Sequence, residues 1–266
     1  MSRLLRGPPT RSLHIFGDSY SCDYPWIPEN KKNWMYHKIL ADYLNLEYYN
    51  YSVIGSSLEH MFIQFDTNKE KIKENDIVII CITSLNRTFF FEEKPWIKEY
   101  DEYCMDEISD TEAIAMKYFF SFLSTQNWHN MLVHLANFLH SVNNLASQLQ
   151  NKILIIDCLG YFRGKAPFNS LEERYENLII PNGVLHDISL GESTNLSLIQ
   201  EVFKRHGGDG RLNHICKNNH DVLAGKIIDY YEKNKEIDFK GFHTNIFSNI
   251  EYYELDYSNQ KNWPVY

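Results

Sequence analysis

A serine that could act as a nucleophile follows a short apolar segment near the N-terminus. Residues 13–16 read Leu-His-Ile-Phe, and Gly17, Asp18 and Ser19 come directly after them. A strand that ends at the ligand-binding edge of an α/β sheet can present such a serine to a substrate. The same tripeptide is also ordinary turn chemistry, with Asp18 fixing the turn through nearby backbone N–H groups. Its meaning therefore depends on whether later segments supply a base and a site for an oxyanion.

Three later segments carry groups of the kind that such a serine needs. Gly55 follows an aromatic segment and could place its backbone N–H against a ligand, although a turn glycine is the simpler alternative. Ser84 and Asn86 follow the most apolar run of the chain. His214 lies in a loop before the last helical segment, where it could accept the serine proton or be merely solvated. Asp209 is the nearest upstream carboxylate, and it could orient His214 or belong to a solvent-facing turn.

The segments that would position these groups alternate between strand and helix patterns. Continuous apolar and β-branched residues at 76–82 are typical of a strand covered on both faces. Asn33 is a candidate cap for the first helical segment. The expected strands cover residues 12–17, 46–51, 76–82 and 152–158, and the expected helices cover 34–44, 57–73, 111–150 and 218–233. This alternation predicts a doubly wound α/β fold with a parallel central sheet.

The chain is expected to form one domain with insertions. The expected parts are a loose N-terminal arm at 1–11, a domain at 12–235 with insertions at about 87–110 and 160–205, and an aromatic tail at 236–266. The tail could pack on the domain or contact another subunit, which would make a homo-oligomer.

Composition excludes several classes of protein. With 26 basic and 35 acidic residues the formal net charge is -9, so we expect no nucleic-acid partner. Five cysteines without a Cys-x-x-Cys spacing argue against a disulfide framework or a zinc site, and we expect no metal and no cofactor. The sequence has neither a secretory signal nor an apolar run of about 18 residues, so we expect no membrane partner and a cytoplasmic site of synthesis.

Taken in order, these segments resemble the SGNH hydrolases, also called the GDSL esterase and lipase family. The resemblance spans most of the chain and rests on the tripeptide 17–19, on Asn50 with Gly55, and on His214 with His220. It implies a flavodoxin-like three-layer α/β/α sandwich. It also implies that Ser19 is the nucleophile, that Gly55 donates an N–H to the oxyanion, that His214 is the base and that His220 opens the terminal helix.

The sequence departs from the family's pattern at two places. The family has Gly-x-Asn-Asp after the third strand, whereas Ser84 stands at the asparagine position, so the third oxyanion donor could be Asn86, Ser84 or Thr83. The family has an acid three residues before the catalytic histidine, whereas Arg211 stands here, which leaves Asp209 or a dyad without an acid. The segment after the third strand is similar to a divergent subset of the family that includes phage-encoded members.

The resemblance implies hydrolysis of a carboxylic ester through an acyl-enzyme. A small-molecule or carbohydrate ester is the expected substrate, with O-acetyl groups on a carbohydrate favoured because aromatic residues are available to stack on sugars. Acyltransferase, lipase and thioesterase activities are alternatives within the same chemistry. The alternative from another class is a catalytically inactive SGNH-fold binding or structural module, such as a virion component if the protein is phage-encoded.

Overall fold

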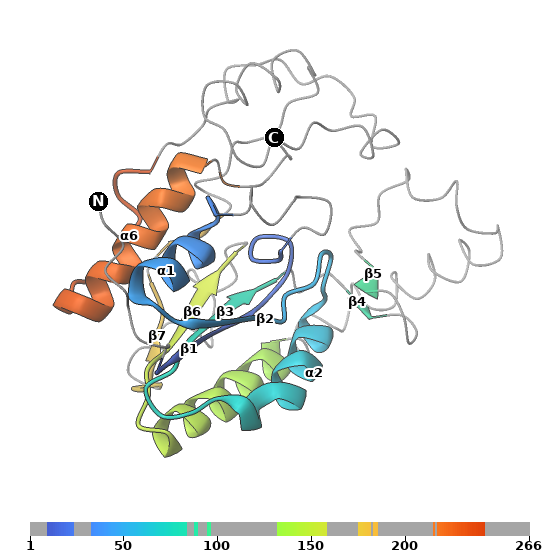
Figure 1. The fold of residues 1–266 in the computed structure, drawn as a ribbon. Coiled ribbons are helices and arrows are strands. Elements are labelled where there is room, and N and C mark those ends of the chain that lie inside the picture. The colour runs from blue at the N-terminus through green and yellow to red at the C-terminus, as the bar shows by residue number, and fades with distance from the viewer. Residues whose placement is uncertain are drawn as a thin grey trace, which may run out of the picture.

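Five strands form one parallel sheet in the part of the chain that the structure describes (Figure 1). The computed structural model describes residues 10–23, 33–83, 132–158, 175–181, 183–185, 215 and 217–242, together with the backbone of 88–89 and 95–96. The strands are β1 (Ser12–Phe16), β2 (Glu47–Asn50), β3 (Ile77–Ile82), β6 (Ile153–Asp157) and β7 (Leu178–Ile179), in the spatial order β2-β1-β3-β6-β7. All neighbouring pairs are parallel, and this order is the flavodoxin-like one.

Helices cover both faces of the sheet. Alternate residues of β3 enter two separate cores, because Val78 and Ile80 face one side and Ile77 and Ile79 face the other. The first core is closed by α2 (Leu58–Asn68) and by a helix over residues 132–148, and the second by α1 (Tyr36–Leu44) and α6 (Lys217–Lys233). Figure 1 shows α1 and α6 on one side of the sheet and the other two helices on the opposite side. The fold is therefore a three-layer α/β/α sandwich, as predicted.

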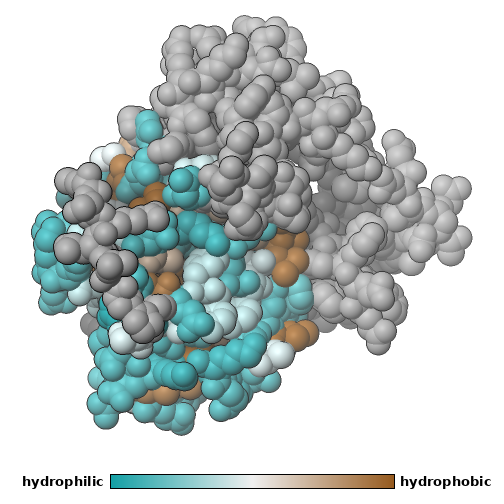
Figure 2. All heavy atoms as spheres, in the orientation of Figure 1, coloured by the Kyte–Doolittle hydropathy of each residue, from teal (hydrophilic) through white to brown (hydrophobic). Residues whose placement is uncertain are grey.

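The described surface agrees with this arrangement. On the face shown in Figure 2, the described residues are mostly hydrophilic, with apolar side chains in small separate patches. No helix in the described part of the chain has the length and apolar character needed to cross a membrane.

The expected elements lie close to the observed ones. Each of the four expected strands is present, with its ends shifted by no more than a residue or two. A short 3-10 helix, η2 (Lys69–Lys71), follows α2 within the expected helical segment. Inside the first expected insertion, β4 (Thr88–Phe89) and β5 (Pro95–Trp96) form an antiparallel pair.

The start of α1 differs from the expectation for Asn33. The residue at the N-cap is Met35, which makes no side-chain capping hydrogen bond, and Asn33 is exposed. The physical reason is that the first helical amide, that of Tyr36, donates to Nδ1 of His220 at 3.2 Å. A side chain from α6 therefore caps α1, and a local cap is not needed there.

Two segments outside the expected strands also pack on the sheet. β7 lies inside the second expected insertion, where Leu178 pairs with Ile153 and is buried. At the start of the expected tail, Ile237 is buried, and the ring of Phe239 occupies the place where a Cβ on Gly183 would lie. Of these two segments the structure describes residues 175–181, 183–185 and 236–242, and the remainder, like the N-terminal arm before residue 10, lies outside the described residues.

Candidate active site

The turn that carries Ser19 begins with a close approach between two strands. Gly17 follows β1 with φ +154°, and a Cβ on it would lie 2.9 Å from the Cβ of Cys81 and 3.1 Å from its carbonyl oxygen. Glycine is therefore required where the chain passes β3. The amides of Ser21 and Cys22 then donate to the Asp18 carbonyl at 3.0 and 2.9 Å. These bonds hold Ser19, which is 6% exposed, in a tight turn at the carboxyl edge of the sheet.

Asp18 anchors this turn to the next strand. Its carboxylate is fully buried; Oδ1 accepts the Tyr20 amide at 3.0 Å, and Oδ2 accepts the Thr83 hydroxyl at 2.8 Å. The first bond is the local backbone contact expected for Asp18, and the second joins the turn to the end of β3. A buried carboxylate with both oxygens engaged as acceptors is not placed to donate to an oxyanion. The single Thr83 hydroxyl proton is engaged as well, which leaves Ser84 and Asn86 as candidates for the third donor.

Gly55 lies in a loop that runs beside the Ser19 turn. Beyond β2, the amides of Tyr51 and Val53 donate to the carbonyls of Ile15 at 2.8 Å and Gly17 at 3.2 Å, so the pairing with β1 continues into the loop. The Ser56 amide then donates to the Val53 carbonyl at 3.1 Å. Gly55, at the third position of this turn, has φ +71°, a conformation that favours glycine. Among the described residues, no backbone hydrogen bond uses the Gly55 amide.

The first turn of α2 holds this loop from the other side. Ser57 is the N-cap of α2, and its Oγ accepts the His60 amide at 3.2 Å. The Oγ of Ser56 lies 3.1 Å from Nδ1 of His60. Burial lowers the pKa of His60 below its ordinary value. The Gly55 loop is thus fixed at the N-terminal end of a helix, where the peptide dipoles favour negative charge.

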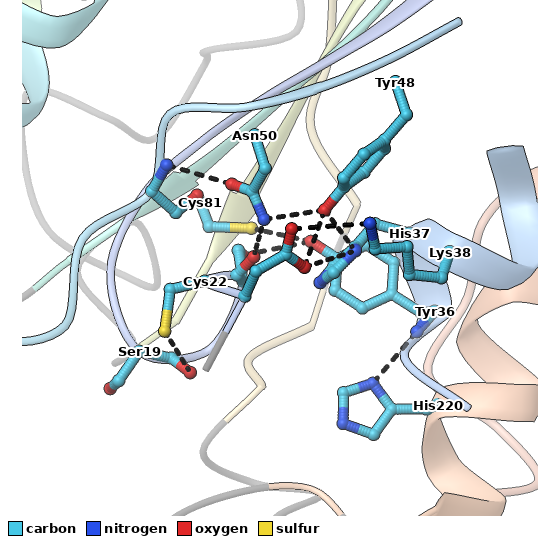
Figure 3. Close-up of polar contacts among 12 residues, drawn as sticks. Ser19, Cys22, Tyr36, His37, Lys38, Tyr48, Asn50, Cys81 and His220 are labelled. Carbon is cyan, nitrogen blue, oxygen red and sulfur yellow. Dashed lines mark hydrogen bonds and ion pairs between the residues drawn. The ribbon is translucent and has the colours of Figure 1, made fainter. Parts of the chain in front are cut away.

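A buried tyrosine supports the Ser19 turn from beneath. The hydroxyl of Tyr36 lies 3.0 Å from Ser21 Oγ and 3.3 Å from Cys81 Sγ (Figure 3). Burial raises the pKa of Tyr36 well above its ordinary value, so its hydroxyl stays protonated. This contact joins the turn to α1 and β3 together.

His220 fixes the helix that follows the predicted base. It lies in the first turn of α6, is buried, stacks on Tyr36 at 5.9 Å between ring centroids, and meets Trp34 edge-on at 5.0 Å. As the resemblance implies, it stands where the terminal helix opens. Ile215, the residue after His214, is buried in the core that α6 closes.

Four predicted site residues lie outside the described residues. They are Ser84, Asn86, Asp209 and His214. The structure therefore places the turn of Asp18 and Ser19 beside the loop of Gly55, and the assignment of base, acid and third donor stays a prediction. No three His, Cys, Asp or Glu side chains in the described ranges gather closely enough to bind a metal ion.

Sequence reasoning missed a polar cluster beside the Ser19 turn. It contains Asp23, His37, Lys38, Tyr48 and Asn50, which come from the end of the turn, from α1 and from β2. Of these residues, only Asn50 was singled out by the sequence, because of its spacing from Gly55. No local pattern marks the others, because their contacts depend on the parallel pairing of β1 with β2.

The comparisons with known proteins give a distant likeness of fold. No family model and no curated protein matches the sequence. Solved structures that match include protein YxiM from Bacillus subtilis, at 14% identity and a TM-score of 0.43, over 88% of this chain and 59% of that one. They also include a carbohydrate esterase, at 11% identity and a TM-score of 0.41, over 87% of this chain and 70% of that one. At these values the likeness carries no weight for function, which must come from this chain's own residues.

Proposed function

We propose that this protein is a serine esterase that hydrolyses a carboxylic ester through an acyl-enzyme. The observation that carries the proposal is the position of Ser19, held in a rigid turn at the carboxyl edge of the sheet beside the loop of Gly55. Nucleophiles and their oxyanion donors must be fixed before the reaction, because reorganisation during the reaction raises its barrier.

In the proposed reaction, the Ser19 hydroxyl attacks the ester carbonyl and His214 accepts its proton. The resulting imidazolium protonates the departing alcohol, and a water molecule activated by the same imidazole then releases the acid. The amides of Ser19 and Gly55 hold the oxyanion, with Ser84 or Asn86 as the third donor. Asp209 orients His214, or the pair Ser19 and His214 acts as a dyad. Each oxyanion donor of this kind contributes about 10²–10³-fold to kcat.

The proposed substrate is a small acyl group, such as acetyl, on a carbohydrate or a similar polar carrier. Lipase, thioesterase and acyltransferase activities use the same acyl-enzyme, so chain length and acceptor must be measured. Hydrolysis of p-nitrophenyl esters of increasing chain length separates an acetyl esterase from a lipase. Release of acetate from acetylated sugars, with and without added alcohols, separates hydrolysis from transfer.

Three variants test the mechanism. Ser19→Ala and His214→Ala should each lower kcat for p-nitrophenyl acetate by at least about 10³-fold. Ser141, an exposed serine of the 132–148 helix, gives a matched control, Ser141→Ala, which should leave kcat unchanged. Equal turnover by the wild type, Ser19→Ala and His214→Ala would overturn the proposal.

The second candidate is an inactive binding or structural module with the same fold. The departures at Ser84 and Arg211 favour it, because they affect the third donor and the acid. A fluorophosphonate probe separates the two, since it labels only an activated serine. Labelling of the wild type but not of Ser19→Ala supports the esterase, and an unlabelled wild type supports the module.

A further inference from the structure

Asn50 lies between the two loops that form the candidate site. It is the last residue of β2 and stands opposite Ile15 in the register with β1. The Ser19 turn follows β1 and the Gly55 loop follows β2, so Asn50 is placed where both loops leave the sheet. Figure 3 shows its side chain at the centre of the polar contacts, with Ser19 and Cys22 on one side and His37 and Lys38 on the other.

The side-chain amide of Asn50 bonds to both loops at once. Nδ2 donates to the Ser21 carbonyl at 2.7 Å, and Oδ1 accepts the Ser52 amide at 2.9 Å. The second proton of Nδ2 goes to the Tyr48 hydroxyl at 2.8 Å. Both amide protons and one oxygen lone pair of Asn50 are therefore in use. If the amide were flipped, Oδ1 would face the Ser21 carbonyl and Nδ2 would face the Ser52 N–H, so both bonds would be lost.

Tyr48 in turn is held so that it cannot follow a moving Asn50. Its hydroxyl donates to Asp23 Oδ1 at 3.0 Å and accepts Nδ1–H of His37 at 2.9 Å, because its single proton is already given to Asp23. Lys38 lies 3.5 Å from the other Asp23 oxygen and 3.7 Å above the Tyr48 ring. Burial lowers the pKa of His37 to about 3, so His37 is neutral and its contact with Tyr48 is a hydrogen bond.

We infer that Asn50 is a positioning residue that sets the distance between the Ser19 nucleophile and the Gly55 amide. This inference rests on the proposed esterase function. Ser21 lies two residues after Ser19 and Ser52 three residues before Gly55, so the amide of Asn50 joins the loops close to both reacting groups. A displacement of about 1 Å between such groups is enough to lower a rate by about 100-fold.

The test compares two asparagines that each join two backbone groups through the side-chain amide, one at the carboxyl ends of the strands and one at their amino ends. Asn151, just before β6, donates from Nδ2 to the Lys73 carbonyl at 2.9 Å and accepts the Asn75 amide at 2.8 Å. Asn50→Asp and Asn151→Asp each keep the acceptor oxygen and lose the donors. Both should lower Tm by similar amounts. Only Asn50→Asp should lower kcat for p-nitrophenyl acetate, by at least tenfold, with KM changed less than about twofold.

Tyr48→Phe is a milder variant, because it removes the acceptor that holds the second amide proton of Asn50 and so loosens the amide that joins the two loops. Tyr48→Phe should lower kcat less than Asn50→Asp does. If Asn50→Asp fails to fold, Tyr48→Phe still tests the inference, because an unchanged kcat in this variant would count against it. A kcat of Asn50→Asp within twofold of that of Asn151→Asp would overturn it.

Amide hydrogen exchange separates failure of this inference from failure of the esterase proposal. The Cys22 and Ser56 amides are protected by bonds within the two loops, and Asn50→Asp should exchange both at least tenfold faster while Asn151→Asp leaves them unchanged. Unchanged exchange in Asn50→Asp overturns the positioning role. Wild-type turnover that does not depend on Ser19 overturns the esterase proposal instead.

Discussion

At the scale of single residues, the candidate site depends on the missing side chain of Gly17 as much as on the side chains around Ser19. Ser19 reaches the edge of the sheet only because Gly17 has no side chain where β1 passes β3. Asp18 then directs its carboxylate inward to Thr83 and the turn. The serine is thus positioned by neighbours that have no part in the proposed chemistry themselves.

Gly17→Ala should destabilise the fold and lower activity. The added Cβ would meet the Cys81 Cβ at 2.9 Å, and φ +154° is rarely adopted by residues with a side chain. We expect a loss of about 2 kcal/mol or more in the free energy of unfolding, measured in urea. Gly225→Ala in α6 is the control, because a Cβ there meets nothing within 4 Å, and it should stabilise by about 0.5–1 kcal/mol. Equal stability of Gly17→Ala and the wild type would contradict the close approach.

Thr83→Val should show that Thr83 anchors Asp18. Valine matches the shape of threonine but leaves a buried Asp18 oxygen without the hydroxyl at 2.8 Å. We expect a loss of about 1–3 kcal/mol in the free energy of unfolding. Thr83→Ser keeps the hydroxyl and should retain the wild-type kcat. A stability of Thr83→Val equal to that of the wild type would remove the anchoring role.

At the scale of elements, α6 and α1 depend on each other at their N-terminal ends. His220→Phe keeps an aromatic ring between Trp34 and Tyr36 and removes the acceptor for the Tyr36 amide. It should lower the free energy of unfolding by about 0.5–2 kcal/mol, the usual effect of losing a helix N-cap. Ser57→Ala, which removes the cap of α2, gives a reference of the same kind. If His220→Phe is as stable as the wild type, the Tyr36 amide has another acceptor.

Local sequence patterns predicted the elements well and the contacts between them poorly. The run at 77–82 is apolar and β-branched throughout, so a buried strand could be predicted from it alone. β7 pairs through only two residues, which is too short for a periodicity to show. The cap from His220 to Tyr36 joins residues 184 positions apart, and no local pattern records such a pair.

The same limit applies to the candidate site. The glycines at 17 and 55 could be predicted because each ends a strand-like segment, and both adopt conformations that favour glycine. The role of Asn50 could not, because it depends on which backbone groups the parallel register places beside it. The sequence also left Thr83 open as an oxyanion donor, and only the position of Asp18 decides against it.

At the scale of the whole molecule, two buried histidines on opposite faces of the sheet link folding to pH. His37 is buried in the first turn of α1, on one face of the sheet, and His14 lies on the other face, where its Nε2 is 3.2 Å from Asp76 Oδ2. Burial lowers the pKa of His37 to about 3, and burial outweighs the attraction of Asp76 in lowering that of His14. In the unfolded chain both return to about 6.5. The unfolded state therefore binds more protons below pH 6.5, and stability must fall as the pH falls through this range.

His37→Asn should flatten this dependence. Asparagine can place an N–H where Nδ1 donates to Tyr48 at 2.9 Å, but it does not titrate. Between about pH 7.5 and pH 5, the wild type should lose about 2 kcal/mol of unfolding free energy through His37 alone, with a further loss through His14. Urea unfolding at both pH values should show the variant losing about 2 kcal/mol less than the wild type. His140→Asn, at one of the two exposed histidines of the 132–148 helix, is the matched surface substitution with which the variant is compared. If unfolding free energy depends on pH equally in His37→Asn and the wild type, His37 gains its proton without unfolding the chain. The hydrogen bond from His37 to Tyr48 must then survive protonation. It can do so only if Nδ1 is already the donor.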